Sequence, residues 1–130
     1  MSDPVWVLPE VVIAVHNMLL AEHGGLSGMR DPDLLDSALA RPKQRAVYEP
    51  GVSLFELASS YSFGLVRNHP FVDGNKRIAF TIATLFLELN GCTLNAPEPE
   101  AVLMHEQLAA SAIDERVLSQ WFERYSSAKD

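Results

Sequence analysis

Hydrophobic residues recur at helical spacing along most of the chain. Val12, Val15 and Leu19 fall on one side of a helix, and the same spacing returns in residues 54–65 and 117–125. No segment shows a sustained alternation of apolar and polar residues, so a sheet of any size is not expected. The pattern predicts helices over residues 9–23, 32–42, 54–68, 78–89, 99–110 and 115–125.

Capping signals mark several ends of these helices. Pro9 suits the first position of a helix, and Gly24 ends the helix that starts there. Asp31, which precedes a proline, is a typical N-cap residue. Ser53 and Glu56 have the spacing of a capping box, with serine at the N-cap and glutamate at the third helical position.

The segment from Ile78 to Leu89 is apolar on nearly every side, which predicts a central helix packed all round. The chain has 130 residues, of which 48% are hydrophobic and 21% charged, as in an ordinary globular protein. We therefore expect an all-α fold. It would be a compact bundle of about six helices around the buried helix, forming a single domain over residues 1–130.

Cysteine usage and apolar run length predict a cytoplasmic protein. Cys92 is the one cysteine, so no internal disulfide forms, which fits a reducing compartment, and it is expected to be buried rather than reactive. The longest apolar stretch is about ten residues, half of what a bilayer requires, so no membrane association is expected. The N-terminal residues lack the basic start and unbroken apolar run of a signal peptide.

Charge is unevenly distributed along the chain. The net charge is −7, yet residues 41–77 carry six basic and three acidic side chains, while the segments on both sides are acidic. The acidic body argues against direct binding of nucleic acid. The basic island suggests either a small polyanionic ligand or an acidic segment of a partner, unless it is only a solvated face. Its cations outside the motif described next are Arg41, Lys43, Arg45 and Arg67.

The segment from His69 to Arg77, which reads His-Pro-Phe-Val-Asp-Gly-Asn-Lys-Arg, carries most of the candidate chemistry. Gly74 allows the chain to turn tightly into the following helix. The N–H groups from Gly74 to Arg77 lack partners in that helix and, together with the helix dipole, form an anion site. Lys76 and Arg77 are unfavourable at this positive helix end, by about 0.3–1 kcal/mol each, unless an anion binds there.

Two further side chains of the segment suit phosphate chemistry. Asp73 places a carboxylate beside this anion site, and Mg²⁺ is typically held by one or two carboxylates plus phosphate oxygens. His69 is the side chain of the segment that can accept a proton near neutral pH. Each residue alone also has an ordinary role in a turn or a cap. Their conjunction before a buried helix is what indicates a site.

Other nucleotide and metal motifs are absent from the sequence. A P-loop needs an earlier glycine and a hydroxyl residue that this segment lacks. His105 and Glu106 begin like the zincin pattern, but the second histidine is missing. His16 and His23 lie seven residues apart on nearly the same helix face, where packing roles are favoured over metal binding.

The segment from His69 to Arg77 resembles the signature of the Fic/Doc superfamily, whose Fic branch reads HPFx[DE]GNGR. Lys76 stands where Fic proteins have glycine and is similar to the Doc (death-on-curing) branch. Phe80 stands where most Fic proteins have a second arginine, and again resembles Doc. The segments 24–32 and 39–49 also look like those of Doc toxins.

This resemblance implies a toxin that transfers the γ-phosphate of ATP to a hydroxyl side chain of a target protein, which in Doc systems is elongation factor Tu. His69 would be the general base and Asp73 would hold Mg²⁺. Arg67, two residues before the histidine, would add positive charge at the point of transfer. The phosphates would be held by Gly74, Asn75, Lys76 and Arg77.

Two other function classes remain open from the sequence. Fic proteins generally transfer AMP, so a Fic-type AMP transferase is one alternative, and a catalytically silent binding module is the other. The inhibitory pattern [ST]xxxE[GN] of many Fic proteins is not completed at Thr84–Leu89 or at Ser119–Arg124. The resemblance therefore implies a separate Phd-like antitoxin, whose C-terminal segment would fold as an acidic amphipathic helix in a groove near the basic island.

Overall fold

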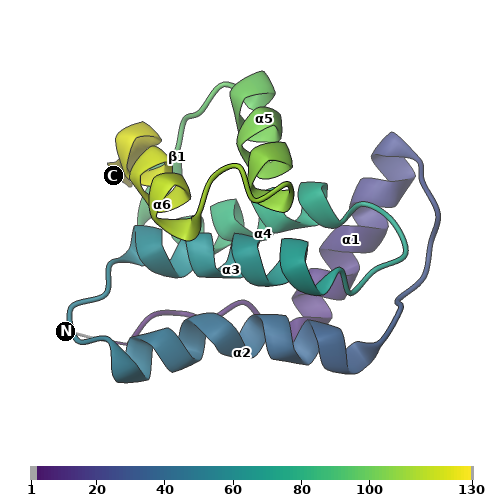
Figure 1. Ribbon diagram of the computed structural model, residues 1–130, viewed down its shortest axis with the longest axis horizontal. Helices are drawn as coiled ribbons and strands as arrows, with labels where there is room; N and C mark the ends of the chain where they lie inside the picture. The colour runs from purple at the N-terminus through teal and green to yellow at the C-terminus, as the bar shows by residue number, and fades with distance from the viewer. Residues whose placement is uncertain (1–2, 130) are drawn as a thin grey trace.

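The computed structural model describes residues 3–129, in which six α-helices and one small sheet form (Figure 1). This confirms the predicted bundle of about six helices. None of these helices combines the length and the apolar character needed to cross a membrane. The elements are α1 (Pro9–His23), α2 (Pro32–Tyr48), α3 (Leu54–Asn68), α4 (Asn75–Leu89), β1 (Cys92–Leu94), α5 (Glu98–Ala109), α6 (Glu115–Tyr125) and β2 (Ser126–Ala128).

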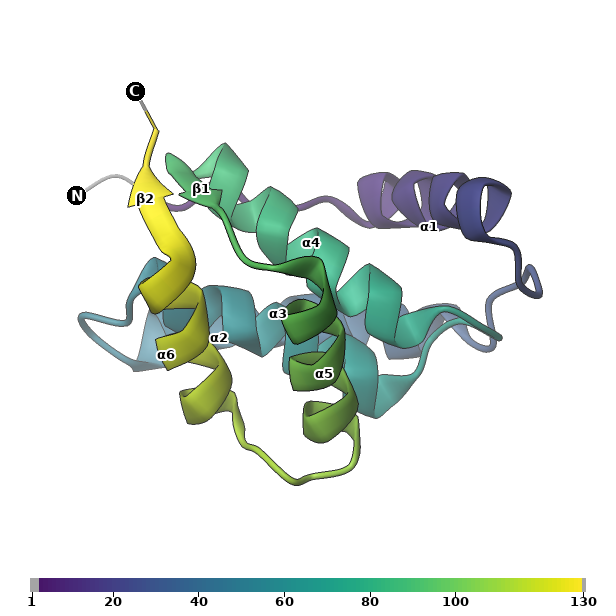
Figure 2. The same cartoon turned by 90° about the horizontal axis from the view of Figure 1, so that it is seen from above.

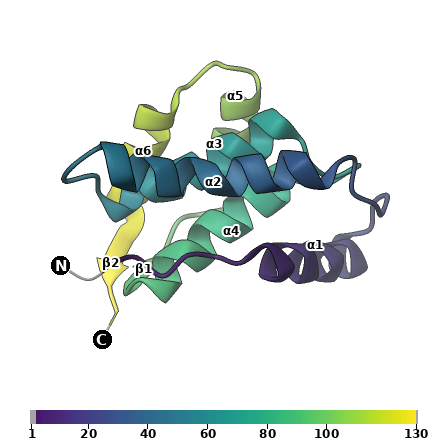
Figure 3. The same ribbon diagram turned by 90° about the horizontal axis from the view of Figure 1, so that it is seen from below.

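Helix α3 lies in the middle of the bundle. Helix α2 runs alongside it on one face, and α5 and α6 cover the opposite face (Figures 1 and 2). Helix α4 packs against α3, and α1 lies at the periphery against α4 (Figure 3). The α1–α2 loop and the α3–α4 loop meet at one end of the bundle, which is where the motif from His69 to Arg77 lies.

The helix that follows the motif is buried as predicted. No residue from Ile78 to Glu88 is exposed, and the fully buried side chains include Ile78, Ile82 and Phe86. Helix α3 shares the centre, because every residue from 57 to 62 is buried. The core thus holds the two helices that flank the motif, so the intervening loop is anchored at both ends.

Helix α2 extends beyond the predicted end at Pro42. Proline has no N–H to donate to the carbonyl four residues earlier, so a stop was expected there. The helix nevertheless continues to Tyr48, and Pro42 is buried within it. Its last turn is held through Arg45, which donates to the Glu56 carbonyl of α3 (3.1 Å) and pairs with the Glu115 carboxylate of α6 (3.3 Å). Contacts with other helices therefore outweigh the tendency of Pro42 to end the helix.

The expectation of no sizeable sheet holds, although two short strands pair. Strand β1 is antiparallel to β2, and each has three residues. The N-terminal segment is fastened nearby, because the Asn90 amide exchanges hydrogen bonds with the backbone of Val5 (2.7 and 2.9 Å). Cys92 is half-buried, and burial raises the pKa of its thiol, as expected for an unreactive cysteine.

Helices α2 and α3 approach each other closely at Gly64. A Cβ at this position would lie 3.0 Å from the carbonyl oxygen of Ala38 and 3.2 Å from its Cα. Backbone atoms cannot move aside as a flexible side chain would. We therefore expect Gly64→Ala to lower the free energy of unfolding by about 1–3 kcal/mol, measured by urea denaturation.

Ser60, one turn earlier on α3, provides the matched control. Its hydroxyl is buried and has no hydrogen-bond partner among the described residues. Because an unpaired buried hydroxyl is unfavourable, Ser60→Ala should leave stability unchanged or raise it. Equal destabilisation by both variants would contradict the close approach at Gly64 as the cause.

Candidate active site

The loop between α3 and α4 has a fixed entry and a fixed exit. His69 caps the C-terminus of α3 in the left-handed conformation (φ 51°, ψ 57°), and its N–H donates to the Leu65 carbonyl (3.2 Å). Gly74 caps the N-terminus of α4, also left-handed (φ 80°). A Cβ at Gly74 would meet only ordinary contacts, 3.6 Å from His16, so glycine is favoured here by backbone conformation rather than by space.

Asn75 closes the loop on itself. Its side-chain Oδ1 accepts from the Phe71 N–H (3.1 Å), and its Nδ2 donates to the Phe71 carbonyl (2.9 Å). The residue is buried, with 4% of its surface exposed. Both ends of the side-chain amide are therefore engaged within the protein, so the predicted phosphate contact of Asn75 is left to its backbone N–H. Asn75 instead fixes the shape of the loop.

The α1–α2 loop clamps the motif loop from outside. Phe71 forms a short antiparallel bridge with Met29. The Arg30 N–H donates to the Pro70 carbonyl (2.7 Å), and its guanidinium donates to the His69 carbonyl (2.8 Å). This loop belongs to the segment 24–32 that resembles Doc toxins in sequence. Its function in the fold, holding the motif, could not be derived from residue spacing.

Asp73 carries the carboxylate expected at the site. Its Oδ2 accepts from the Leu26 N–H (3.0 Å) and its Oδ1 accepts from the Gly74 N–H (2.8 Å). These backbone hydrogen bonds, with a smaller contribution from Arg77, lower the pKa of Asp73. The side chain is therefore a fixed, ionised carboxylate. Gly25 permits this arrangement, since a Cβ there would lie 2.8 Å from Oδ2.

A cleft of about 550 Å³ opens above the start of α4. His69, Lys76 and Arg77 line it, and all three are exposed. The N–H groups of Asn75, Lys76 and Arg77 have no hydrogen-bond partner among the described residues. The structure thus brings the base candidate, the carboxylate of Asp73, two cations and free helix N–H groups to one cleft, as the sequence predicted.

Arg67 does not line this cleft. It lies in the last turn of α3 and donates to the Ser111 hydroxyl in the α5–α6 turn, with its guanidinium 5.3 Å from the centre of the Phe63 ring. The structure therefore does not place Arg67 in the lining of the cleft, because its side chain contacts Ser111 in the α5–α6 turn instead. That Arg67 adds charge at the point of transfer stays a prediction.

Two more histidines line the cleft, His23 at the end of α1 and His105 on α5. His105 is buried, its Nδ1 donates to the Ala101 carbonyl (2.9 Å), and its Nε2 lies 2.9 Å from the Ser62 hydroxyl. Burial lowers the pKa of His105 to about 4, so its imidazole is neutral at physiological pH. It anchors α5 to α3 and shapes the wall. His69, which is exposed and whose imidazole has no protein hydrogen-bond partner among the described residues, is the better-placed base.

The donor set of the cleft fits a magnesium–nucleotide complex. Residues 3–129 contain no cluster of three or more metal-ligating side chains, so a divalent cation here would need ligands from its substrate. Mg²⁺ binds in this way, with one or two carboxylates and phosphate oxygens. The carboxylate of Asp73 beside Lys76, Arg77 and free N–H groups matches that requirement.

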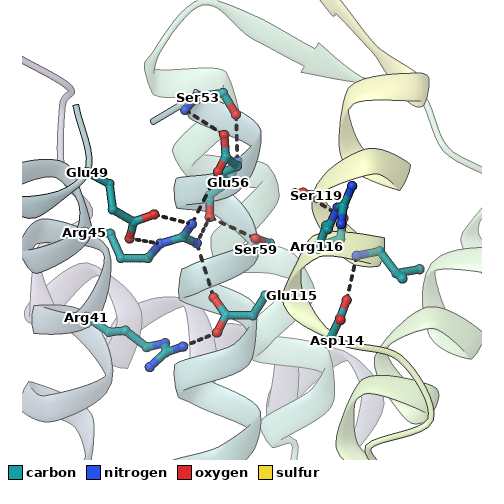
Figure 4. A network of polar contacts seen from close by, with 11 residues as sticks. Arg41, Arg45, Glu49, Ser53, Glu56, Ser59, Asp114, Glu115, Arg116 and Ser119 are labelled. Carbon is teal, nitrogen blue, oxygen red and sulfur yellow. Dashed lines mark hydrogen bonds and ion pairs between the residues drawn. The ribbon is translucent and has the colours of Figure 1, made fainter. Parts of the chain in front are cut away.

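Two other cations of the basic island, Arg41 and Arg45, form ion pairs within the chain. Arg41 pairs with Glu115, and Arg45 pairs with Glu49, Glu56 and Glu115 (Figure 4). These ion pairs line a groove of about 1090 Å³ between α2, α3 and α6. Carboxylates of the same chain therefore already pair with Arg41 and Arg45, and binding of an acidic partner segment at this island stays a prediction.

Comparison with known proteins gives consistent matches. A family model described as "Fic/DOC family" matches residues 6–87. "Protein kinase doc" of Escherichia phage P1 is 39% identical over 93 residues, which are 71% of this chain and 74% of that protein. "Toxin Doc" of Mycolicibacterium smegmatis is 47% identical over 77 residues, which are 56% of this chain and 57% of that protein. The family match covers both the motif loop and the loop that clamps it.

Proposed function

The chain belongs to the Fic/DOC family, and from that premise we propose that it is a Doc-type toxin that transfers the γ-phosphate of ATP to a hydroxyl side chain of a target protein. The observation that carries this proposal is the cleft, in which an exposed histidine, an ionised carboxylate and the cationic start of α4 face one space. Phosphoryl transfer depends mainly on positioning and neutralisation of charge, which this set of groups supplies.

ATP with Mg²⁺ is the proposed cofactor pair. Asp73 holds the metal, and the phosphates bind Lys76, Arg77 and the free N–H groups at the start of α4, including that of Asn75. Bound magnesium would neutralise charge that develops between the phosphates. The helix N-terminus supports this assignment, because it favours an anion exactly where Lys76 and Arg77 would otherwise be unfavourable.

His69 is the proposed general base. In the cleft it would accept the proton of the target hydroxyl as the oxygen attacks the γ-phosphorus, and the ADP leaving group would be stabilised by the cations of α4. The carbonyl of His69 is fixed by Arg30, so the residue is held at its backbone while its imidazole stays free to meet the substrate.

Transfer of AMP is the alternative that the cleft favours less. Fic-type chemistry is associated with glycine in place of Lys76 and a second arginine in place of Phe80. Here the Phe80 ring is half-buried and packs edge-on against His105 (5.4 Å between ring centres). No cation therefore projects from this position, which supports transfer of the γ-phosphate rather than of AMP.

The proposed partners are a translation factor as target and an antitoxin as inhibitor. Elongation factor Tu is the proposed substrate, and a Phd-like antitoxin is proposed to bind the chain through a C-terminal helix. The two partial inhibitory patterns of this sequence place no glutamate in the cleft. Glu88 pairs with Lys129 (3.1 Å), and Glu123 lines the groove beside α6. Residues 1–130 are proposed to act as one domain.

Growth of bacteria that express the chain tests the toxin proposal. Expression alone should arrest growth, because a modified translation factor would limit protein synthesis, and co-expression of the product of the neighbouring gene should restore it. His69→Ala serves as the inactive control. Harmless expression of a wild-type chain that modifies its target in vitro would contradict the proposal, as would arrest that the neighbouring product fails to relieve.

A further inference from the structure

His16 lies on the buried face of α1 but has no role in the chemistry described above. Together with Val12 it forms the part of α1 that is fully removed from solvent, with 3% of its surface exposed. A histidine on an apolar face usually serves packing. This one also reaches the motif loop, which is 57 residues away in sequence.

Two contacts join His16 to that loop. Its Nε2 lies 2.8 Å from the carbonyl oxygen of Asp73, and because a carbonyl can only accept, the imidazole donates. Its ring stacks on Phe71, with ring centres 3.8 Å apart and an interplanar angle of 12°. The stacking fixes the plane of the imidazole, and the hydrogen bond fixes the peptide that follows Asp73.

Asp73 is consequently held at three points from three parts of the chain. The α1–α2 loop donates to its Oδ2 through Leu26, the start of α4 donates to its Oδ1 through Gly74, and α1 donates to its carbonyl through His16. The first two contacts orient the carboxylate itself. The third contact fixes the backbone from which that side chain projects.

We propose that His16 is a positioning residue, which holds the backbone of Asp73 so that its carboxylate faces the cleft at the place where a magnesium–nucleotide complex binds. This inference rests on the proposed function, since it assigns Asp73 to the metal. Outer-shell partners of this kind change metal affinity or activity about 10–100-fold when they are replaced.

Three variants separate positioning from packing. His16→Phe retains a buried aromatic ring against Phe71 but removes the donor, whereas His16→Gln keeps an N–H donor of similar reach. Val12→Ala, one turn earlier on the same buried face, weakens the core without touching the loop. Thermal unfolding of each variant measures stability, and calorimetry with MgATP measures binding independently of turnover.

The Mg²⁺ concentration that gives half-maximal transfer should rise about 10–100-fold in His16→Phe, and MgATP affinity should fall with it. His16→Gln should recover most of this loss, and Val12→Ala should lower the melting temperature without moving the Mg²⁺ dependence. If His16→Phe fails to fold, His16→Asn, whose amide is too short to reach the Asp73 carbonyl, should show the same loss.

The inference would be overturned by unchanged Mg²⁺ dependence and MgATP affinity in His16→Phe or His16→Asn, or by an equal shift in Val12→Ala. A wild-type chain that binds MgATP but transfers nothing would count against the proposed function instead. In that case the calorimetric comparison of the His16 variants still decides whether this residue positions Asp73.

Discussion

Replacement of His69 by alanine is expected to reduce phosphate transfer by about 10²–10⁴-fold, the usual effect of losing a general base. The imidazole is exposed and makes no hydrogen bond to the described part of the protein, so its loss opens no cavity in the core. Single-turnover transfer to elongation factor Tu measures the rate, and thermal unfolding measures the fold.

The left-handed backbone of His69 calls for a second variant. Alanine is strained at φ 51°, so His69→Ala alone could lose activity through a displaced loop. Asparagine tolerates this conformation better, so His69→Asn should preserve the loop and still lack the base. Both variants should be equally inactive. Near wild-type transfer by His69→Asn would show that the base assignment is wrong.

The second large effect is expected from Lys76→Gly. A charge-assisted hydrogen bond contributes about 1.5–3 kcal/mol, so loss of the ammonium should lower phosphate transfer by about 10–100-fold. Stability should change little, since removal of a cation from a helix N-terminus offsets the cost of glycine in the first turn. The same transfer assay, with products separated by mass spectrometry, measures the rate and identifies the transferred group.

Lys43→Ala is the matched control, because it also removes one exposed lysine ammonium group. Lys43 is also exposed and belongs to the basic island, but it lies on α2 and does not line the cleft. Its removal should leave transfer unchanged. A loss of equal size in both variants would point to a long-range effect of net charge, and undiminished transfer by Lys76→Gly would remove Lys76 from any role in orienting ATP.

Local signals were sufficient to predict the helices, because caps and periodicity act over a few residues. The Asp31 cap and the Ser53–Glu56 capping box form as predicted, and Asp114 caps α6 in the same way as Asp31 caps α2. Pro42 shows where this reasoning fails. The extension of α2 depends on ion pairs with α3 and α6, and no local pattern can reveal those partners.

For the site as well, the sequence predicts what depends on neighbouring residues and misses what depends on contacts between distant segments. His69, Asp73, Lys76 and Arg77 are close in sequence, so their convergence on one cleft followed from the motif. Asn75 and Arg67 were assigned by resemblance, and the structure gives their side chains other partners. The sequence signal for His16, a polar residue on an apolar stripe, was visible but was compatible with packing alone.

The contacts between the α1–α2 loop and the motif loop show that the nine motif residues alone do not fix the geometry of the site. The α1–α2 loop contributes Leu26 to the carboxylate of Asp73 and Arg30 to the carbonyl of His69. Because a Cβ at position 25 would lie 2.8 Å from the same carboxylate, glycine is favoured there. A chain that carried the nine motif residues without this loop would lack the contacts that fix the base and the metal-binding carboxylate.

The central claim is transfer of the γ-phosphate of ATP, and the position of a radioactive phosphorus label tests it most directly. Purified chain, Mg²⁺ and elongation factor Tu are incubated with ATP labelled at either the γ or the α phosphate. The account predicts label on the target from γ-labelled ATP, none from α-labelled ATP, and none from either with His69→Asn. Label from α-labelled ATP would contradict it and identify an AMP transferase.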